Sequence, residues 1–127
     1  MTFHDLLVEI KTLRFEESRS QTEEYFEAVI SRNGLEPLHK ILTSYFGVPL
    51  KPEGQQPSWK ASRHAKPHGG IRTNQTMYFR QDGHHSECVL LWPWGSGTCV
   101  TVKIIQYKNA RSSTNFLEFL AMLFTRK

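Results

Sequence analysis

The spacing of apolar residues changes once along this chain, near Ile71, and this change constrains the fold more than any other feature. Before it, apolar residues recur every three or four positions, the period of an amphipathic helix, as in FHDLLVEIKTL at residues 3–13. After it they alternate, the period of a β-strand, as in TCVTVKIIQYK at residues 98–108. Helices followed by strands indicate an α+β domain.

The helical part of the chain predicts three N-terminal helices, at residues 3–13, 23–32 and 37–46. Thr2 with Asp5, and Ser20 with Glu23, have the spacing of a capping box at the start of the first two helices. Gly47 follows the third helix, where a glycine commonly ends one. Each helix is apolar on one side only, so all three need a partner later in the chain.

Residues 48–70 contain four prolines and three glycines, a composition that breaks helices and central strands. We therefore expect an irregular connection here, inside a single domain that spans residues 1–127. The alternative is that this segment links two subdomains.

The alternating part predicts a three-stranded antiparallel β-meander, with strands at residues 71–80, 86–92 and 98–108. Asp82-Gly83 is a strong two-residue hairpin signal. A turn at this dipeptide pairs Met77 with Cys88, so that both side chains lie on one face of the sheet.

The register of the second hairpin follows from where Lys103 would lie. A two-residue Gly95-Ser96 turn places Lys103 opposite Cys88 on the apolar face, whereas a five-residue loop, Pro93–Gly97, places Val102 there. We therefore expect the five-residue loop. One sheet face then carries the apolar residues that the helices cover: Ile71, Met77, Phe79, Cys88, Leu90, Trp92, Val100, Val102 and Ile104.

The last stretch, NARSSTNFLEFLAMLFTRK, predicts a C-terminal helix that Ser113 or a neighbouring residue caps. The expected fold is thus an α+β domain with three N-terminal helices, a three-stranded antiparallel meander and a C-terminal helix. All the helices pack on one face of the sheet.

Composition narrows the class of protein. No apolar run approaches the roughly 20 residues that a membrane span needs, and the N-terminus lacks the pattern of a signal peptide. Two cysteines are too few for a disulfide scaffold, so we expect free thiols and a cytoplasmic protein. The formal net charge is +4, and the excess of basic residues lies after residue 50. This asymmetry reflects either ordinary helix and loop surfaces or a cationic face for an anionic partner.

Four of the six histidines lie between residues 64 and 85, but they do not predict a metal site. His64 and His68 have the spacing of two ligands on one helix, yet Pro67 between them disfavours that helix. Neither cysteine belongs to a CxxC pair, and no glycine-rich phosphate loop or nucleophile–base motif is present. We expect no metal and no cofactor. An enzyme built around this histidine-rich stretch is an alternative hypothesis.

The predicted register places cationic and aromatic residues on the second sheet face: Arg72, Tyr78, Arg80, Lys103 and Tyr107. The connection before the sheet adds Trp59, Lys60 and Arg63. Basic side chains interleaved with aromatic rings suit single-stranded nucleic acid. The competing interpretation is that this face is buried, either under residues 48–70 or against a second copy. Trp94, at a loop tip, is either an exposed anchor for a partner or folded back on its own sheet.

These patterns favour a small non-enzymatic binding or adaptor domain that meets another protein, or a second copy of itself, through the second sheet face. The alternative binding hypothesis is a nucleic-acid or other polyanion-binding protein that uses the basic residues of the 51–85 region.

Overall fold

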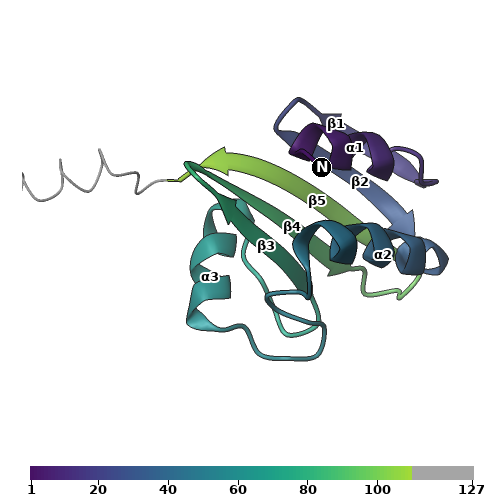
Figure 1. Ribbon diagram of the computed structural model, residues 1–127. Helices are drawn as coiled ribbons and strands as arrows, with labels where there is room; N and C mark the ends of the chain where they lie inside the picture. Colours follow the sequence, from purple (N-terminus) through teal and green to yellow (C-terminus); the bar gives the residue numbers. More distant parts are fainter. Residues whose placement is uncertain (110–127) are drawn as a thin grey trace, which may run out of the picture.

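The computed structural model describes residues 1–109, which form three α-helices and a five-stranded antiparallel sheet (Figure 1). The helices are α1 (Phe3–Ile10), α2 (Leu35–Phe46) and α3 (Trp59–Ala65). The strands are β1 (Glu17–Gln21), β2 (Tyr25–Ser31), β3 (Thr76–Asp82), β4 (His85–Pro93) and β5 (Cys99–Lys108). Their order in the sheet is β1-β2-β5-β4-β3. The α+β class is confirmed, and the C-terminal helix expected from Ser113 onward lies outside the described residues.

The three-stranded meander is wrong, because residues 25–31, in the segment expected to form the second helix, are the strand β2, which forms a hairpin with β1. β1 and β2 pair with each other, and β2 also pairs with β5 along its whole length. In β2, Phe26 and Ile30 face α1 and α2, while Val29 is buried on the opposite face. Val29, buried next to Ile30, interrupts the alternation of this strand. Tyr25, Phe26, Val29 and Ile30 then have the spacing of a helical stripe.

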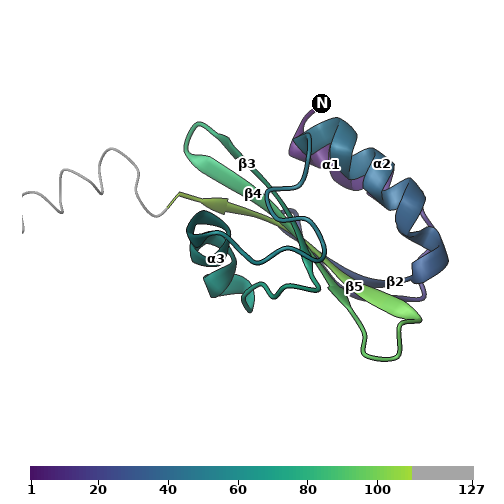
Figure 2. The same ribbon diagram turned by 90° about the horizontal axis from the view of Figure 1, so that it is seen from below.

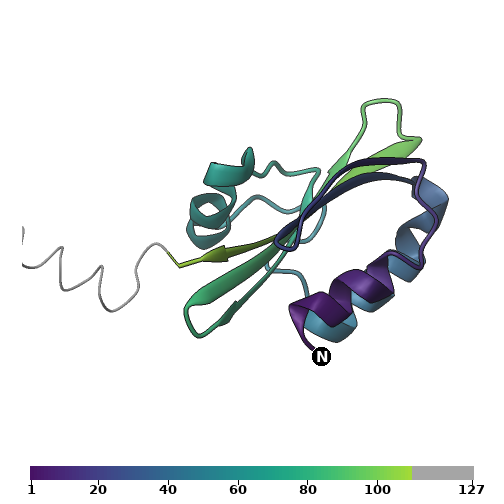
Figure 3. The same cartoon turned by 90° about the horizontal axis from the view of Figure 1, so that it is seen from above.

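The helices cover both faces of the sheet, not one face as expected. Figures 2 and 3 show α1 and α2 side by side on one face and α3 on the other. Two separate apolar clusters match these two layers. Each face of the sheet therefore has its own core, and a strand buried on both sides need not keep one side polar.

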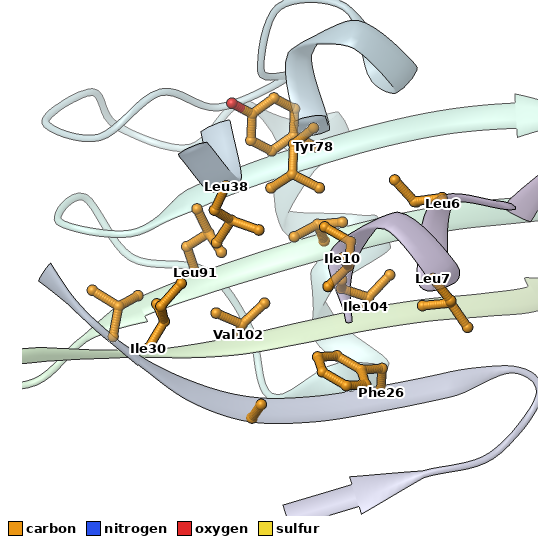
Figure 4. Packing of buried hydrophobic residues seen from close by; sticks show 14 of the residues in the cluster. Leu6, Leu7, Ile10, Phe26, Ile30, Leu38, Tyr78, Leu91, Val102 and Ile104 are labelled. Atoms are coloured by element: carbon orange, nitrogen blue, oxygen red, sulfur yellow. The ribbon is translucent and has the colours of Figure 1, made fainter. Parts of the chain in front are cut away.

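The larger core lies between the sheet and the pair α1 and α2 (Figure 4). Leu6 and Ile10 from α1 and Leu38 and Leu42 from α2 are completely buried in it. Burial of each such side chain contributes roughly 1.5–3 kcal/mol, most of which chain entropy offsets. The expected capping box at the start of α1 is present: the Thr2 hydroxyl accepts from the Asp5 backbone, and the Asp5 carboxylate accepts from the Thr2 backbone.

The hairpin of β3 and β4 has the expected faces but a different pairing. Met77, Phe79, Cys88 and Leu90 share the face that α3 covers, as predicted. However, Cys88 lies opposite Phe79, not Met77, because the turn is at Gly83-His84, one residue later than expected. Each residue that the turn moves along the chain shifts the pairing by two positions, which leaves the faces unchanged.

The β4–β5 hairpin has neither of the two registers compared above, but its faces are those that the sequence argument rejected. Lys103 lies on the same face as Cys88 and directly opposite Leu90. Val100 and Val102 therefore turn to the α1 and α2 face and join the larger core. The prediction was wrong because it assumed one covered face, so that a lysine had to point away from it. Because helices cover both faces, the valines of β5 would be buried whichever face they pointed to.

The connection at residues 48–70 is not wholly irregular, since it contains α3. Ser58 caps this helix by accepting from the Ala61 backbone, and Pro67 lies in the 3-10 turn Lys66–His68 that follows. The proline thus ends the α-helix but does not prevent it, because a proline is tolerated in the first turn of a helical segment.

Lys51 anchors the connection to the sheet. Its side chain is 1% exposed, and its ammonium donates to the carbonyl oxygens of Pro52, Thr73 and Gln75. Its backbone also forms an antiparallel bridge with Met77 at the edge strand β3. Burial lowers the pKa of the Lys51 ammonium. Both ends of the segment that carries α3 are therefore held at one point.

Candidate functional site

The residues expected on the second sheet face do not form one surface. Tyr78 and Arg80 lie on the face that α1 and α2 cover, whereas Lys103 and Tyr107 lie on the face of α3. Arg72 is exposed in the loop before β3. The common face of this set depended on the expected five-residue loop between β4 and β5, which the structure contradicts. Each residue is therefore described in its own surroundings.

Tyr78 belongs to the core. Its side chain is 1% exposed, and its hydroxyl lies 2.8 Å from His39 Nδ1 and 3.2 Å from Thr43 Oγ1, both on α2. Burial raises the pKa of Tyr78 and lowers that of His39, so both groups are held neutral. This group of side chains fastens α2 to β3.

Arg80 is neutralised by its neighbours. Its guanidinium lies 3.6 Å from the Glu87 carboxylate and 3.5 Å from that of Asp82, and it stacks over the Tyr45 ring at 4.7 Å. Glu87 is 2% exposed and also accepts hydrogen bonds from Tyr45 (2.5 Å) and Gln106 (3.0 Å). The buried carboxylate thus uses Arg80 as its counter-ion.

Trp94 folds back on its own sheet. Its indole N–H donates to Thr101 Oγ1 at 2.9 Å, and the guanidinium of Arg19 lies 5.9 Å from its ring centroid. The residue is still 39% exposed. An indole held by a hydrogen bond and a cation needs no external partner to explain its position.

An exposed patch, which we call the α3 surface, combines an indole with three basic side chains on α3 and just after it: Trp59, Lys60, Arg63 and Lys66. Trp59 is 76% exposed, and the Arg63 guanidinium lies 5.0 Å from its ring centroid. From Gly54 to Gln81 the chain carries five Lys and Arg residues and no Asp or Glu. The segment around the patch therefore supplies no carboxylate to neutralise it.

Small side chains bring α3 close to the sheet. Ala61 and Ala65, one turn apart, are fully buried against Met77, Cys88 and Leu90. Burial also raises the pKa of the Cys88 thiol to about 12, so the thiolate that reacts as a nucleophile is not formed near neutral pH. The buried side of α3 is thus structural, and its outer side is available to a partner.

A cleft lies where α3 meets the ends of β3, β4 and β5. We call it the α3 cleft; its volume is about 360 Å³, within the range of small-ligand sites. It is lined by Arg63, His64, Pro67, Gln81, Ser86, Tyr107 and Asn109. These lining residues include hydrogen-bonding groups, aromatic rings and a guanidinium, but no carboxylate.

His64 stands between the cleft and the sheet. Its ring stacks on Phe79 with centroids 4.2 Å apart, and its Nδ1 lies 3.4 Å from the Tyr107 hydroxyl. Burial lowers the pKa of His64, and the positive charges of Arg63 and Lys60 lower it further. Within residues 1–109, no acidic side chain lies at hydrogen-bond distance from His64 to offset these positive charges.

The histidines do not converge on a common centre. His68 packs against Tyr107 with ring centroids 4.9 Å apart, and its buried Nε2 has no hydrogen-bond partner among the described residues. His84 and His85 lie at the β3–β4 turn. Within residues 1–109, no three His, Cys, Asp or Glu side chains are grouped so that they could hold a metal ion.

Sequence reasoning identified the basic residues of α3 but missed the cleft beside them. Gln81, Ser86 and Asn109 come from three strand ends, and no local pattern links them. The signal that was available is the long run without acidic residues, which marks the basic side of the molecule.

No protein-family model, curated protein or solved structure matches this chain. Among residues 1–109, no helix combines the length and apolar character that crossing a membrane requires. The functional argument therefore depends on the side chains themselves.

Proposed function

We propose that this protein is a non-enzymatic binding domain whose α3 surface holds a polyanion, and that single-stranded nucleic acid is the ligand class that suits it best. The observation that carries this proposal is the coincidence of three exposed cations and an exposed indole on α3 and the 3-10 turn that follows it, in a segment that lacks acidic residues. A cytoplasmic location is part of the proposal, because Cys88 and Cys99 are unpaired, as thiols are in a reducing compartment.

Charge supports a polyanion as the partner. Lys60 and Arg63 project from α3 and Lys66 from the 3-10 turn that follows it, so their positive charges repel each other until an anion neutralises them. Each phosphate that they contact releases condensed counterions, which contributes to affinity at low salt. By contrast Arg80, the other cation of this region that lies on the sheet, already has two carboxylates beside it.

The exposed indole supports a single strand as the form of that polyanion. Trp59 keeps most of its surface in solvent while Arg63 lies over its ring. Unstacked bases pack on such rings and contribute about 1–3 kcal/mol per base, whereas the bases of a duplex are not accessible to them.

The two other hypotheses lose support. The protein–protein hypothesis used the second sheet face, on which Tyr78 is now covered by α2 and Arg80 is paired. The enzyme hypothesis requires a histidine and a carboxylate within hydrogen-bond reach. In the described part of the chain, the side chains at hydrogen-bond distance from His64 are those of Tyr107 and Arg63, and neither is a carboxylate.

The test is binding of a labelled single-stranded oligothymidylate, measured by fluorescence anisotropy at salt concentrations between about 50 and 200 mM. The double variant Lys60→Ala, Arg63→Ala should bind more weakly, with a slope of log K against log salt that is less steep by about 1.4, since each lost phosphate contact removes about 0.7. Trp59→Ala should reduce the affinity without changing this slope, because stacking involves no counterion.

The matched control is Lys11→Ala with Lys40→Ala, two exposed residues at α1 and on α2. It changes the net charge equally but leaves the α3 surface intact, so its affinity should remain close to that of the wild type. An equal loss in the control would show that only net charge matters and would remove the α3 surface from the proposal. Failure of the wild type to bind at low salt would refute polyanion binding itself.

A further inference from the structure

The α3 cleft and the α3 surface share one residue, Arg63. We infer that the cleft takes one nucleobase of a bound strand while Arg63 holds the phosphate next to that base. This inference deepens the proposed function and depends on it. The shared chemistry is a nucleobase that carries a phosphate, supplied either by a strand or by a free nucleotide.

The floor of the cleft is built from side chains that already satisfy each other. The Ser86 hydroxyl donates to the Asn109 side-chain oxygen, and the Asn109 amide donates to the Gly83 carbonyl at 2.9 Å. These bonds join the residue after β5 to the β3–β4 turn and to the start of β4, so this side of the cleft is held in place before a ligand binds.

Two groups remain for a ligand. Gln81 is exposed at the end of β3 and makes no side-chain hydrogen bond within residues 1–109, so its amide offers both a donor and an acceptor to a base edge. The Tyr107 hydroxyl lies 3.4 Å from His64 Nδ1, a distance at the long limit of a hydrogen bond. A flat heterocycle with polar edges fits a cleft that is lined by the rings of His64 and Tyr107 and offers the hydrogen-bonding groups of Gln81 and Tyr107.

The charge at the cleft favours an anionic ligand. Arg63 lines the cleft, and the Lys60 ammonium lies 5.5 Å from the centroid of the Phe79 ring, on which the His64 ring also stacks. Among residues 1–109, the side chains that line the cleft include no carboxylate. The lowered pKa of His64 has burial as its main cause and these two cations as the next, so a phosphate at Arg63 would relieve part of the repulsion. A neutral base alone would not do so.

The experiment compares three probes: oligothymidylate, a strand of the same length made of abasic deoxyribose phosphates, and thymidine monophosphate. The cleft variant is Gln81→Ala with Tyr107→Phe, which removes the side-chain amide and the hydroxyl but keeps the aromatic ring at position 107. It should weaken binding of oligothymidylate about fivefold or more, the effect of one net hydrogen bond or two, and leave binding of the abasic strand unchanged. Gln21→Ala, at an exposed position of β1, is the matched control and should change neither.

The place of binding is read independently by NMR. Oligothymidylate should shift the ring signals of His64 and the side-chain amide signals of Gln81, while the abasic strand should leave the Gln81 signals in place. If the cleft variant weakens both strands equally, or neither, the cleft does not read a base and the inference is wrong, although strand binding at the α3 surface stands.

The remaining outcomes separate the two sources. If thymidine monophosphate binds with the same dependence on Gln81 and Tyr107 but neither strand binds, the cleft inference holds for a free nucleotide and the proposed strand binding fails. If none of the three probes binds at low salt, both proposals are overturned.

Discussion

The ammonium group of Lys103 lies 3.9 Å from the centroid of the Trp92 ring, on the sheet face that α3 covers. This contact explains how a lysine occupies a row that also contains Leu90. The charge lies over the face of an indole, whose ring quadrupole attracts it. The sheet therefore accepts the register that buries the valines of β5 on the opposite face.

Removing this charge should change the acid–base behaviour of His68. Burial is the main cause of the lowered pKa of His68, and Lys103 lowers it further. Lys103→Met keeps most of the side-chain volume, so the pKa of His68 should rise toward the ordinary value of about 6.5 but stay below it. An NMR pH titration of the His68 ring measures the shift. Lys108→Met, at the exposed end of the same strand, should leave it unchanged; an unchanged pKa in Lys103→Met would contradict this view.

Gly69 and Gly70 should differ in their tolerance of alanine. Both have positive φ, 109° and 87°, so each substitution costs about 1–2 kcal/mol in backbone strain. At Gly69 an added Cβ would also meet the Trp92 ring within 2.9 Å, whereas at Gly70 nothing lies within 4 Å. Gly69→Ala should therefore lower the free energy of unfolding by a further 1–3 kcal/mol or so relative to Gly70→Ala. Urea denaturation of both variants measures the difference, and equal losses would mean that the close packing on Trp92 is incorrect.

The Lys51 ammonium should be a major contributor to stability. Lys51→Met removes three hydrogen bonds to backbone carbonyls and leaves those buried oxygens without their donor, at a cost on the order of 3 kcal/mol. Lys40→Met, on the exposed side of α2, should change the unfolding free energy by less than about 0.5 kcal/mol. Chemical denaturation tests both. A small effect at Lys51 would show that other contacts hold the connection that carries α3.

Local patterns were sufficient where one stretch of chain decides its own structure. α1 has its capping box and its apolar stripe, α2 ends at Gly47 as expected, and the first hairpin has the predicted faces. In each case the signal lies within a few residues, because capping and turn preferences act at that range.

The candidate site was only partly accessible to the same reasoning. The cationic character of Lys60 and Arg63 is visible in the sequence, but the helix that displays them is not, because Pro67 and the flanking glycines suggested an irregular segment. The cleft beside them joins residues from three strand ends, and their proximity depends on how the strands pair.

By itself, the sequence determined the α+β class, the start of α1, the end of α2, and the basic segment without acidic residues. The tertiary structure alone decided that residues 25–31 form a strand and that Lys103 shares a face with Leu90. For residues 25–31, the adjacent Val29 and Ile30 give the spacing of a helical stripe, and only pairing with β1 and β5 decides that they form a strand. For Lys103, helices lie on both faces of the sheet, so the valines of β5 can be buried on either face and the apolar pattern alone does not fix the register.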